Sequence, residues 1–201
     1  MIEIKSQLEQ AIETGYSYEE YRSKVNLLLE KGMTTGENQT DKLLNFTSLN
    51  VKRMNKWDKI LKVDSRVKEE ILSIENKQVW MVLVEAWCGD AAQNLPVIAK
   101  LSELNQNIEL KIVLRDENPE IMDQYLTNGS RSIPKLVAFN KESMEEIAQW
   151  GPRPQAVQEL LAEFKQQENF VYEEFAVAAH TWYAKDKGQT LQQELKELIA
   201  K

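Results

Sequence analysis

The apolar positions of this chain follow two different periods. Before residue 73 and after residue 153, apolar side chains recur three or four positions apart, which predicts amphipathic helices at both ends of the chain. Between them, short apolar or alternating runs predict strands at residues 79–84, 107–115, 135–139 and 144–150. The pattern therefore predicts an α/β fold in which the middle of the chain builds the sheet.

The order of these elements also predicts how the strands pair. A helix between the first two strands implies that they are parallel and joined by a right-handed crossover. The short link at residues 140–143 predicts that the last two strands form an antiparallel hairpin. The sheet is therefore expected to be mixed.

Start and stop signals mark the N-terminal helices. Ser17 and Glu20 form a capping-box pair for a helix that ends before Gly32, and a longer helix is expected from Asp41. One face of the longer helix is expected to contain Leu44, Thr47, Val51, Met54, Asp58 and Leu61. The same segment carries the basic residues Lys52, Arg53, Lys56, Lys59 and Lys62. They form either a patch for an anion or a partner, or a solvated helix face, and we favour the solvated face.

The first strand runs directly into a turn and a helix at Trp87, Cys88, Gly89 and Asp90. We expect Gly89 to allow the tight turn and Asp90 to accept hydrogen bonds from the first N–H groups of the helix. Cys88 then lies at a helix N-terminus, whose partial positive charge favours the reactive thiolate. A nearby carboxylate opposes the thiolate, so the direction of the pKa shift stays open. We favour a reactive thiol over a small buried apolar residue.

The residues around this turn resemble a known family. Trp87, Cys88 and Gly89 after a hydrophobic strand resemble the active-site opening of the thioredoxin superfamily. Residues 130–139 resemble that family's cis-proline loop and the strand that follows it. The Trp-Cys-Gly-Asp-Ala variant, which ends at Ala91, is similar to a bacterial subgroup usually called thioredoxin family protein.

The resemblance implies a fold and limits for its parts. We expect a thioredoxin-like mixed sheet flanked by helices over residues 64–167. Helical extensions are expected at residues 1–63 and 168–201. A thioredoxin-like domain over residues 64–167 has a size that is ordinary for one globular domain.

The resemblance also implies roles for the proline loop. It implies that the bond between Ile133 and Pro134 is cis, that the loop faces Cys88, and that the Ile133 backbone pairs with an extended substrate. Trp87 is expected on the rim of the site. Arg131 either lowers the thiol pKa or holds an anionic substrate, or it is an exposed loop residue, and these alternatives stay open.

Two residues depart from the family pattern. Ala91 occupies the position of the second cysteine of thioredoxins, and Val82 occupies that of their buried carboxylate. Because Cys88 is the only cysteine, no internal disulfide can form and the available chemistry is that of a single thiol. We expect thiol–disulfide exchange with a disulfide-bearing protein or a low-molecular-weight thiol. The alternative is a redox-inactive binding module that uses the groove beside Pro134.

His180 and Arg115 are two further candidates. His180 is the only histidine and can in principle meet Cys88 in space, but a histidine on an aromatic helix more often serves packing. Arg115 follows the second strand at its carboxyl end, where open α/β sheets tend to place their sites. We favour a loop ion pair for Arg115, with Asp116 or Glu117.

Composition narrows the partners and the compartment. The formal net charge of −7 argues against general nucleic-acid binding, which relies on lysine and arginine facing phosphates. A single cysteine argues against a zinc site built from several thiolates, and we expect no metal and no cofactor. The start of the sequence lacks a signal-peptide pattern, and no segment is long and apolar enough to span a bilayer. We therefore expect a cytoplasmic protein that does not act at a membrane.

Overall fold

The computed structural model describes residues 2–199 and confirms the α/β fold. In this part of the chain, four strands form one sheet in the order β2-β1-β3-β4. The strand bounds are β1 Gln78–Val84, β2 Ile108–Leu114, β3 Lys135–Asn140 and β4 Glu146–Trp150. The helices are α1 Ile2–Thr14, α2 Tyr18–Glu30, α3 Asp41–Ile60, α4 Ser65–Leu72, α5 Gly89–Ser102, α6 Pro119–Met122, α7 Gln155–Lys165, α8 Tyr172–Asp186 and α9 Gln189–Ile199.

The sheet is mixed, as predicted. Strands β1 and β2 are parallel and are joined through α5, while β3 is antiparallel to both β1 and β4. Every residue of β1 is buried, because helices cover both faces of the sheet at this strand. The carboxyl end of β1, where the cysteine turn begins, therefore emerges from the centre of the sheet.

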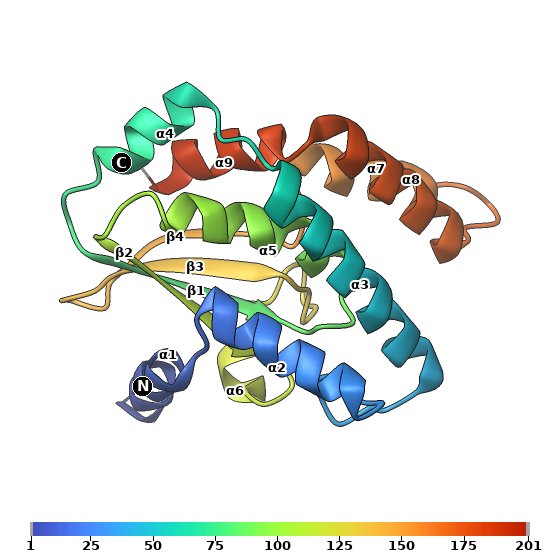
Figure 1. The fold of residues 1–201 in the computed structure, drawn as a ribbon, viewed down its shortest axis with the longest axis horizontal. Helices are drawn as coiled ribbons and strands as arrows, with labels where there is room; N and C mark the ends of the chain where they lie inside the picture. Colours follow the sequence, from blue (N-terminus) through green and yellow to red (C-terminus); the bar gives the residue numbers. More distant parts are fainter. Residues whose placement is uncertain (1, 200–201) are drawn as a thin grey trace.

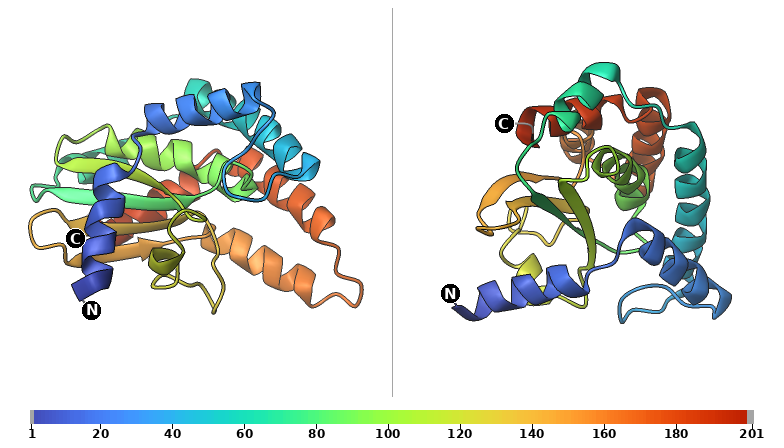
Figure 2. Two further views of the ribbon diagram at one scale, coloured as in Figure 1. Left: turned by 90° about the horizontal axis from the view of Figure 1, so that it is seen from below. Right: turned by 60° about the vertical axis from the view of Figure 1, so that its left-hand side comes forward.

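Helices cover the two faces of the sheet unequally. Helices α5 and α9 lie over one face of the sheet (Figure 1). Helix α4 packs against these two helices, and α3 runs along α5. On the opposite side lie α1, α2 and α6, and α1 contacts both α6 and β2 (Figure 2). Helices α7 and α8 pack against each other and enclose a small cluster of their own, formed by Val157, Phe175, Ala179 and Tyr183.

Helices from both ends of the chain contribute to the main core. Tyr21 and Val25 of α2, Met54 of α3 and Leu195 of α9 are buried in the same cluster as the strand residues. The link between α1 and α2 covers one edge of the sheet. The backbone of Tyr16 in this link pairs with that of Ile112 in the edge strand β2, through two hydrogen bonds of 2.7 and 2.8 Å. The terminal helices are therefore packed parts of the fold.

Local signals correctly placed both ends of α2 and the start of α3. The capping box of α2 is present: the Ser17 N–H donates to the Glu20 carboxylate at 2.8 Å, and the Glu20 N–H donates to the Ser17 hydroxyl at 3.3 Å. Helix α3 begins at Asp41 as predicted, after an N-cap at Thr40. Helix α6, which begins at Pro119, is a single turn and ends at Met122.

The buried face of α3 differs from the predicted face. Its buried residues are Thr47, Asn50, Met54 and Trp57. Asp58 lies on the exposed side, where it forms an ion pair with Arg22. Sequence reasoning missed Asn50 and Trp57 because each is buried through a polar hydrogen bond as well as by apolar contact. The predicted solvated face is confirmed for Lys52, Lys56, Lys59 and Lys62, whereas Arg53 is only partly exposed.

Candidate functional site

Cys88 is the N-cap residue of α5 and is nearly enclosed. Its Sγ accepts a hydrogen bond from the Ala91 N–H at 3.5 Å, and its S–H donates to the carbonyl of Ile133 at 3.3 Å. The residue is 9% exposed. The expectation that Asp90 caps this helix was wrong, because Cys88 itself caps it and the Asp90 carboxylate is used elsewhere.

Burial raises the pKa of the Cys88 thiol to about 12. The negative charge of Asp90 adds to this rise, while hydrogen bonds from the Ala91 and Asp90 backbone and the charge of Arg153 oppose it. Desolvation thus outweighs the partial positive charge of the helix N-terminus, on which the expected thiolate depended. The thiol is protonated at neutral pH, and its donated hydrogen bond to Ile133 is consistent with that form.

The proline loop lies against the thiol. The bond between Ile133 and Pro134 is cis, and the loop faces Cys88, as the resemblance implied. The Ile133 carbonyl, however, already accepts the thiol hydrogen bond. A second cis bond joins Gly151 to Pro152, at a glycine with φ of 122° whose added Cβ would lie 2.2 Å from the Pro134 oxygen. Only glycine fits there, so the segment before Arg153 packs directly against the backbone of the proline loop.

Asp90 and Arg153 form a buried ion pair beside Cys88. An Asp90 carboxylate oxygen lies 2.6 Å from an Arg153 nitrogen, and the two side chains are 12% and 14% exposed. The other carboxylate oxygen accepts a hydrogen bond from the Tyr183 hydroxyl at 3.0 Å, and that hydroxyl accepts one from Asn94 at 3.1 Å. Burial raises the pKa of Asp90, and the neighbouring Arg153 guanidinium partly offsets this effect. Sequence reasoning missed Arg153 because nothing local links it to the cysteine turn.

His180 packs against the turn, although it is not bonded to the thiol. Its Nδ1 lies 2.9 Å from the Gln93 amide nitrogen, and the Gln93 amide oxygen accepts the Trp57 indole N–H at 2.6 Å. Since the amide nitrogen can only donate, Nδ1 accepts and the proton of the neutral ring is on Nε2. Burial and the charge of Arg53 lower the pKa of His180 to about 4, so the ring is neutral at pH 7.

This packing explains Gly89. An added Cβ on Gly89 would lie 3.2 Å from Cε1 and 3.3 Å from Nε2 of His180. Gly89 was expected to allow the tight turn, but its backbone is not in the left-handed region, so the turn does not depend on the conformational freedom of glycine. The glycine instead leaves room for the imidazole.

The arginines of the two neighbouring loops form surface ion pairs. Arg131 makes a two-pronged pair with Asp123, with both distances at 2.7 Å, and is half exposed. Arg115 pairs with Asp116 at 2.7 Å and stacks over the Trp87 ring at 4.9 Å from its centroid. The favoured ion pair of Arg115 is therefore confirmed. The cation that lowers the pKa of the Cys88 thiol is Arg153. Arg131 is an exposed loop residue that pairs with Asp123.

A cavity of about 550 Å³ opens above the cysteine turn. Its walls come from α3, the turn, the proline loop and α8, and are largely apolar. Of the sequence-predicted site residues, it is lined by Trp87, Cys88, Gly89, Asp90, Arg131 and Ile133. Ala91 and Pro134 are not among the residues that line it. The structure thus brings the two predicted motifs together, and adds α3 and α8 as walls that the motifs did not predict.

A buried carboxylate also lies close to the turn, at a position that sequence reasoning missed. Glu85 follows the last residue of β1, is fully buried, and accepts the Asp116 N–H at 2.8 Å. Burial raises the pKa of its carboxyl group. Val82, at the position of the family's buried carboxylate, lies within β1, whereas the carboxylate of Glu85 lies just after the end of this strand. The sequence signal that could have identified Glu85 is a charged residue placed directly after an apolar run.

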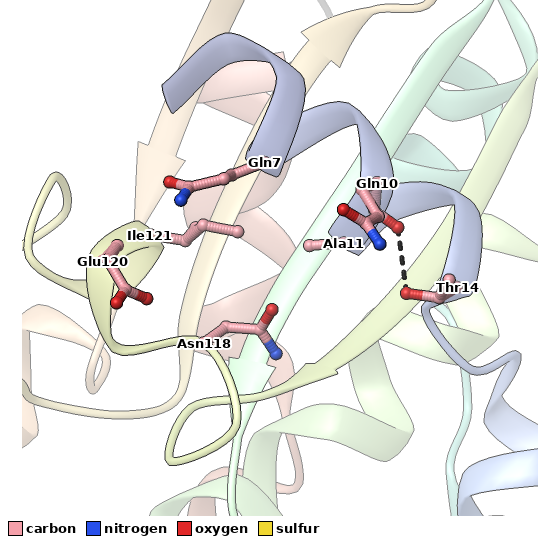
Figure 3. Close-up of a pocket in the computed structure, with 7 residues that line it drawn as sticks. All are labelled: Gln7, Gln10, Ala11, Thr14, Asn118, Glu120 and Ile121. Atoms are coloured by element: carbon pink, nitrogen blue, oxygen red, sulfur yellow. Dashed lines mark hydrogen bonds between the residues drawn. The ribbon is translucent and has the colours of Figure 1, made fainter. Parts of the chain in front are cut away.

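A smaller cavity of about 220 Å³ lies between α1 and α6, away from the cysteine turn (Figure 3). Its lining is mostly uncharged, with Gln7, Gln10 and Thr14 on one side and Asn118 on the other.

Among residues 2–199, no group of three or more histidine, cysteine, aspartate or glutamate side chains is placed to hold a metal ion. Over the same residues, no helix has the length and apolar character needed to cross a membrane.

Replacing Arg153 by methionine should destabilise the protein by about 3–5 kcal/mol, because Asp90 would remain buried without its partner. The double variant Asp90→Asn/Arg153→Met should recover part of this loss, since it leaves no unpaired charge. Arg66→Met, at an exposed arginine of α4, is the matched control and should change the free energy of unfolding by no more than about 0.5 kcal/mol. Urea denaturation measures all three, and equal stabilities of Arg153→Met and Arg66→Met would contradict the role of the pair.

The single histidine allows a direct test of the local electrostatics. In an NMR titration, the Hε1 signal of His180 should have its midpoint near pH 4, well below the usual value of 6.5. Since the unfolded chain takes up this proton first, the free energy of unfolding should fall as the pH drops from about 6.5 to 4. His180→Gln should lose less stability over that interval. A native midpoint at or above 6.5 would show that the imidazole is not buried as described.

Comparison with known proteins agrees with this architecture. The sequence model of a family described as thioredoxin matches residues 36–165, more than half of the chain. A comparison with curated proteins finds no match.

Two solved structures are similar in fold. The crystal structure of a protein of unknown function from Pseudomonas aeruginosa is 18% identical, with 94% of both chains covered and a TM-score of 0.58. An HIV epitope-scaffold is also 18% identical, with 95% of this chain and 96% of its own covered and a TM-score of 0.59. At such identities the likeness concerns the fold alone. Because the family match runs from before α3 to the end of α7 and includes both the cysteine turn and the proline loop, this chain belongs to the thioredoxin family.

Proposed function

We propose that this chain is a thioredoxin-fold binding module, which holds a ligand with an apolar surface in the cavity beside the proline loop and has no redox turnover. The observation that carries this proposal is a cavity of about 550 Å³ with largely apolar walls, placed over a buried, protonated thiol. Ligand sites in proteins commonly have this size and this kind of lining. The family fold alone would not decide between binding and catalysis.

The chemistry of Cys88 supports binding over exchange. Disulfide exchange requires a thiolate, and here burial and the Asp90 charge favour the neutral thiol. Neither a second cysteine nor a carboxylate at the Val82 position is present to assist the reaction. In addition, the Ile133 carbonyl, which would pair with an extended substrate, already accepts the thiol hydrogen bond, so a substrate would have to share this oxygen with Cys88.

Thiol–disulfide exchange is the second candidate, and one observation favours it: Cys88 lines the cavity. In that reaction the Cys88 thiolate attacks one sulfur of a disulfide, a mixed disulfide forms, and the other sulfur leaves as a thiolate. A second thiol then attacks the mixed disulfide and releases Cys88. The substrate would be a disulfide-bearing protein or the disulfide of a low-molecular-weight thiol. The reaction first requires loss of the thiol proton and of its bond to Ile133.

The rate of Cys88 alkylation by iodoacetamide across pH separates the two candidates. We expect the native protein to react slowly, with an apparent thiol pKa above the reference value of about 8.5, because the thiol is desolvated. The same protein unfolded in urea is the control and should react with the reference pKa. Fast native alkylation with a pKa below the reference would contradict the binding proposal and favour exchange.

A cavity-filling substitution tests binding itself. Ala176 of α8 lines the cavity, so Ala176→Trp should weaken binding of the neutral apolar dye Nile red by about tenfold or more, which corresponds to about 1.4 kcal/mol. Ala184→Trp, at an exposed position of the same helix outside the cavity, is the matched control and should bind as the wild type. Cys88→Ser should also retain binding, since no sulfur chemistry is involved. Dye fluorescence measures the affinity, and equal affinities of the two tryptophan variants would refute the cavity as the site.

A further inference from the structure

One cation of the cavity has no ion-pair partner. Four of the basic residues that line it are paired: Lys42 with Glu173, Arg115 with Asp116, Arg131 with Asp123 and Arg153 with Asp90. Within residues 2–199, no ion pair involves Arg53, although this side chain also lines the cavity. Asp90 acts on Arg53 at longer range, but both of its carboxylate oxygens are already used by Arg153 and Tyr183.

The Arg53 guanidinium is held in place from behind. It donates a hydrogen bond of 2.7 Å to the Asn50 amide oxygen, and the Asn50 amide nitrogen donates one of 2.8 Å to the Ala86 carbonyl. Asn50 is fully buried, so this support is fixed relative to the end of β1. A guanidinium has five N–H donors, and within the described part of the chain only this one hydrogen bond to a side chain occupies them. Half-burial without a carboxylate is costly for a cation, and burial lowers the pKa of Arg53.

A second donor lies close to Arg53 on the same wall of the cavity. The hydrogen-bond chain from Trp57 through Gln93 fixes the proton of His180 on Nε2. The position of an added Cβ on Gly89 is 3.3 Å from His180 Nε2 and 3.8 Å from an Arg53 terminal nitrogen. The two donor nitrogens therefore lie beside Gly89, no more than about 7 Å apart, on the wall of the cavity. A single carboxylate in the cavity, with one oxygen toward each nitrogen, can span this separation.

The walls beyond these donors are apolar. Leu43, Phe46 and Leu49 of α3 and Phe175, Ala176 and Val177 of α8 line the cavity. Phe46, Leu49 and Val177 are 39%, 45% and 69% exposed and line the same cavity, so they form a contiguous apolar surface there. A charged donor pair next to apolar walls complements a ligand with one anionic end and an apolar body.

We infer that the ligand of this cavity is an amphipathic monocarboxylate, with its carboxylate on Arg53 and His180 and its apolar chain between α3 and α8. This inference rests on the proposed binding function and names the ligand class. One guanidinium and one neutral imidazole supply a single positive charge, which matches a monoanion. A dianionic phosphate would bring an uncompensated negative charge close to Asp90, so the site disfavours it.

Displacement of Nile red by decanoate and by 1-decanol tests the inference, because the two share a chain and differ in charge. Decanoate should displace the dye from the wild type at a concentration at least about tenfold lower than decanol. Arg53→Gln should weaken decanoate by about tenfold or more and leave decanol unchanged. Lys52→Gln, which removes the neighbouring exposed cation of α3, is the matched control and should behave as the wild type.

The outcomes separate the inference from the proposed function. Equal potency of decanoate and decanol on the wild type, or an unchanged decanoate affinity in Arg53→Gln, would overturn the carboxylate site while leaving an apolar binding module. Failure of the dye and of both ligands to bind the wild type would overturn both. If Arg53→Gln does not fold, Arg53→Lys replaces it. This variant keeps the charge but loses the planar fork, and should weaken decanoate by about threefold or more with no change for decanol.

Discussion

The ion pair between Asp90 and Arg153 ties together the parts of the molecule that surround the cysteine turn. Asp90 belongs to the first turn of α5, Arg153 to the segment between β4 and α7, and Tyr183 to α8. A charge that is largely removed from solvent is tolerated only when it is paired and hydrogen-bonded, so the pair holds the three elements together. The Arg153 guanidinium also stacks over Phe175, 5.5 Å from its ring centroid, which extends the connection along α8. The cavity between α3 and α8 depends on this arrangement.

The same pair helps to set the state of the thiol. Asp90 lies close enough to Cys88 to raise its pKa, and Arg153 offsets only part of that effect. Burial is the larger cause, because the thiol is enclosed by the turn and the proline loop. The scaffold that positions a reactive cysteine in other members of the family here holds a neutral hydrogen-bond donor. In the binding function that we propose, the thiol is a part of the cavity wall and the neighbouring side chains recognise the ligand.

Helices α3 and α8, which lie before and after the strands in the sequence, form two walls of the cavity. Helix α3 contributes apolar side chains and Arg53, and α8 contributes apolar side chains and His180. Two polar chains anchor these helices to the turn, one from Asn50 to the Ala86 carbonyl and the other from Trp57 through Gln93 to His180. Each chain is buried and fully paired at its centre, which fixes geometry more strictly than apolar packing does. The ligand class that we infer follows from what these two helices place over an otherwise familiar turn.

The sequence by itself determined the features that depend on neighbouring residues. The mixed sheet, the capping box of Ser17 and Glu20, and the position of Cys88 at a helix start all follow from local periodicity and short motifs. The proline loop beside Cys88 was predictable because its residues resemble a family motif. The tertiary structure alone decided the pKa of Cys88, since desolvation depends on everything packed around the sulfur. It also decided that Asp90 pairs with Arg153, that Gly89 makes room for His180, and that Arg53 differs from the lysines around it. Each of these outcomes depends on contacts between residues far apart in the chain, and a local pattern carries no information about which distant side chain will meet it.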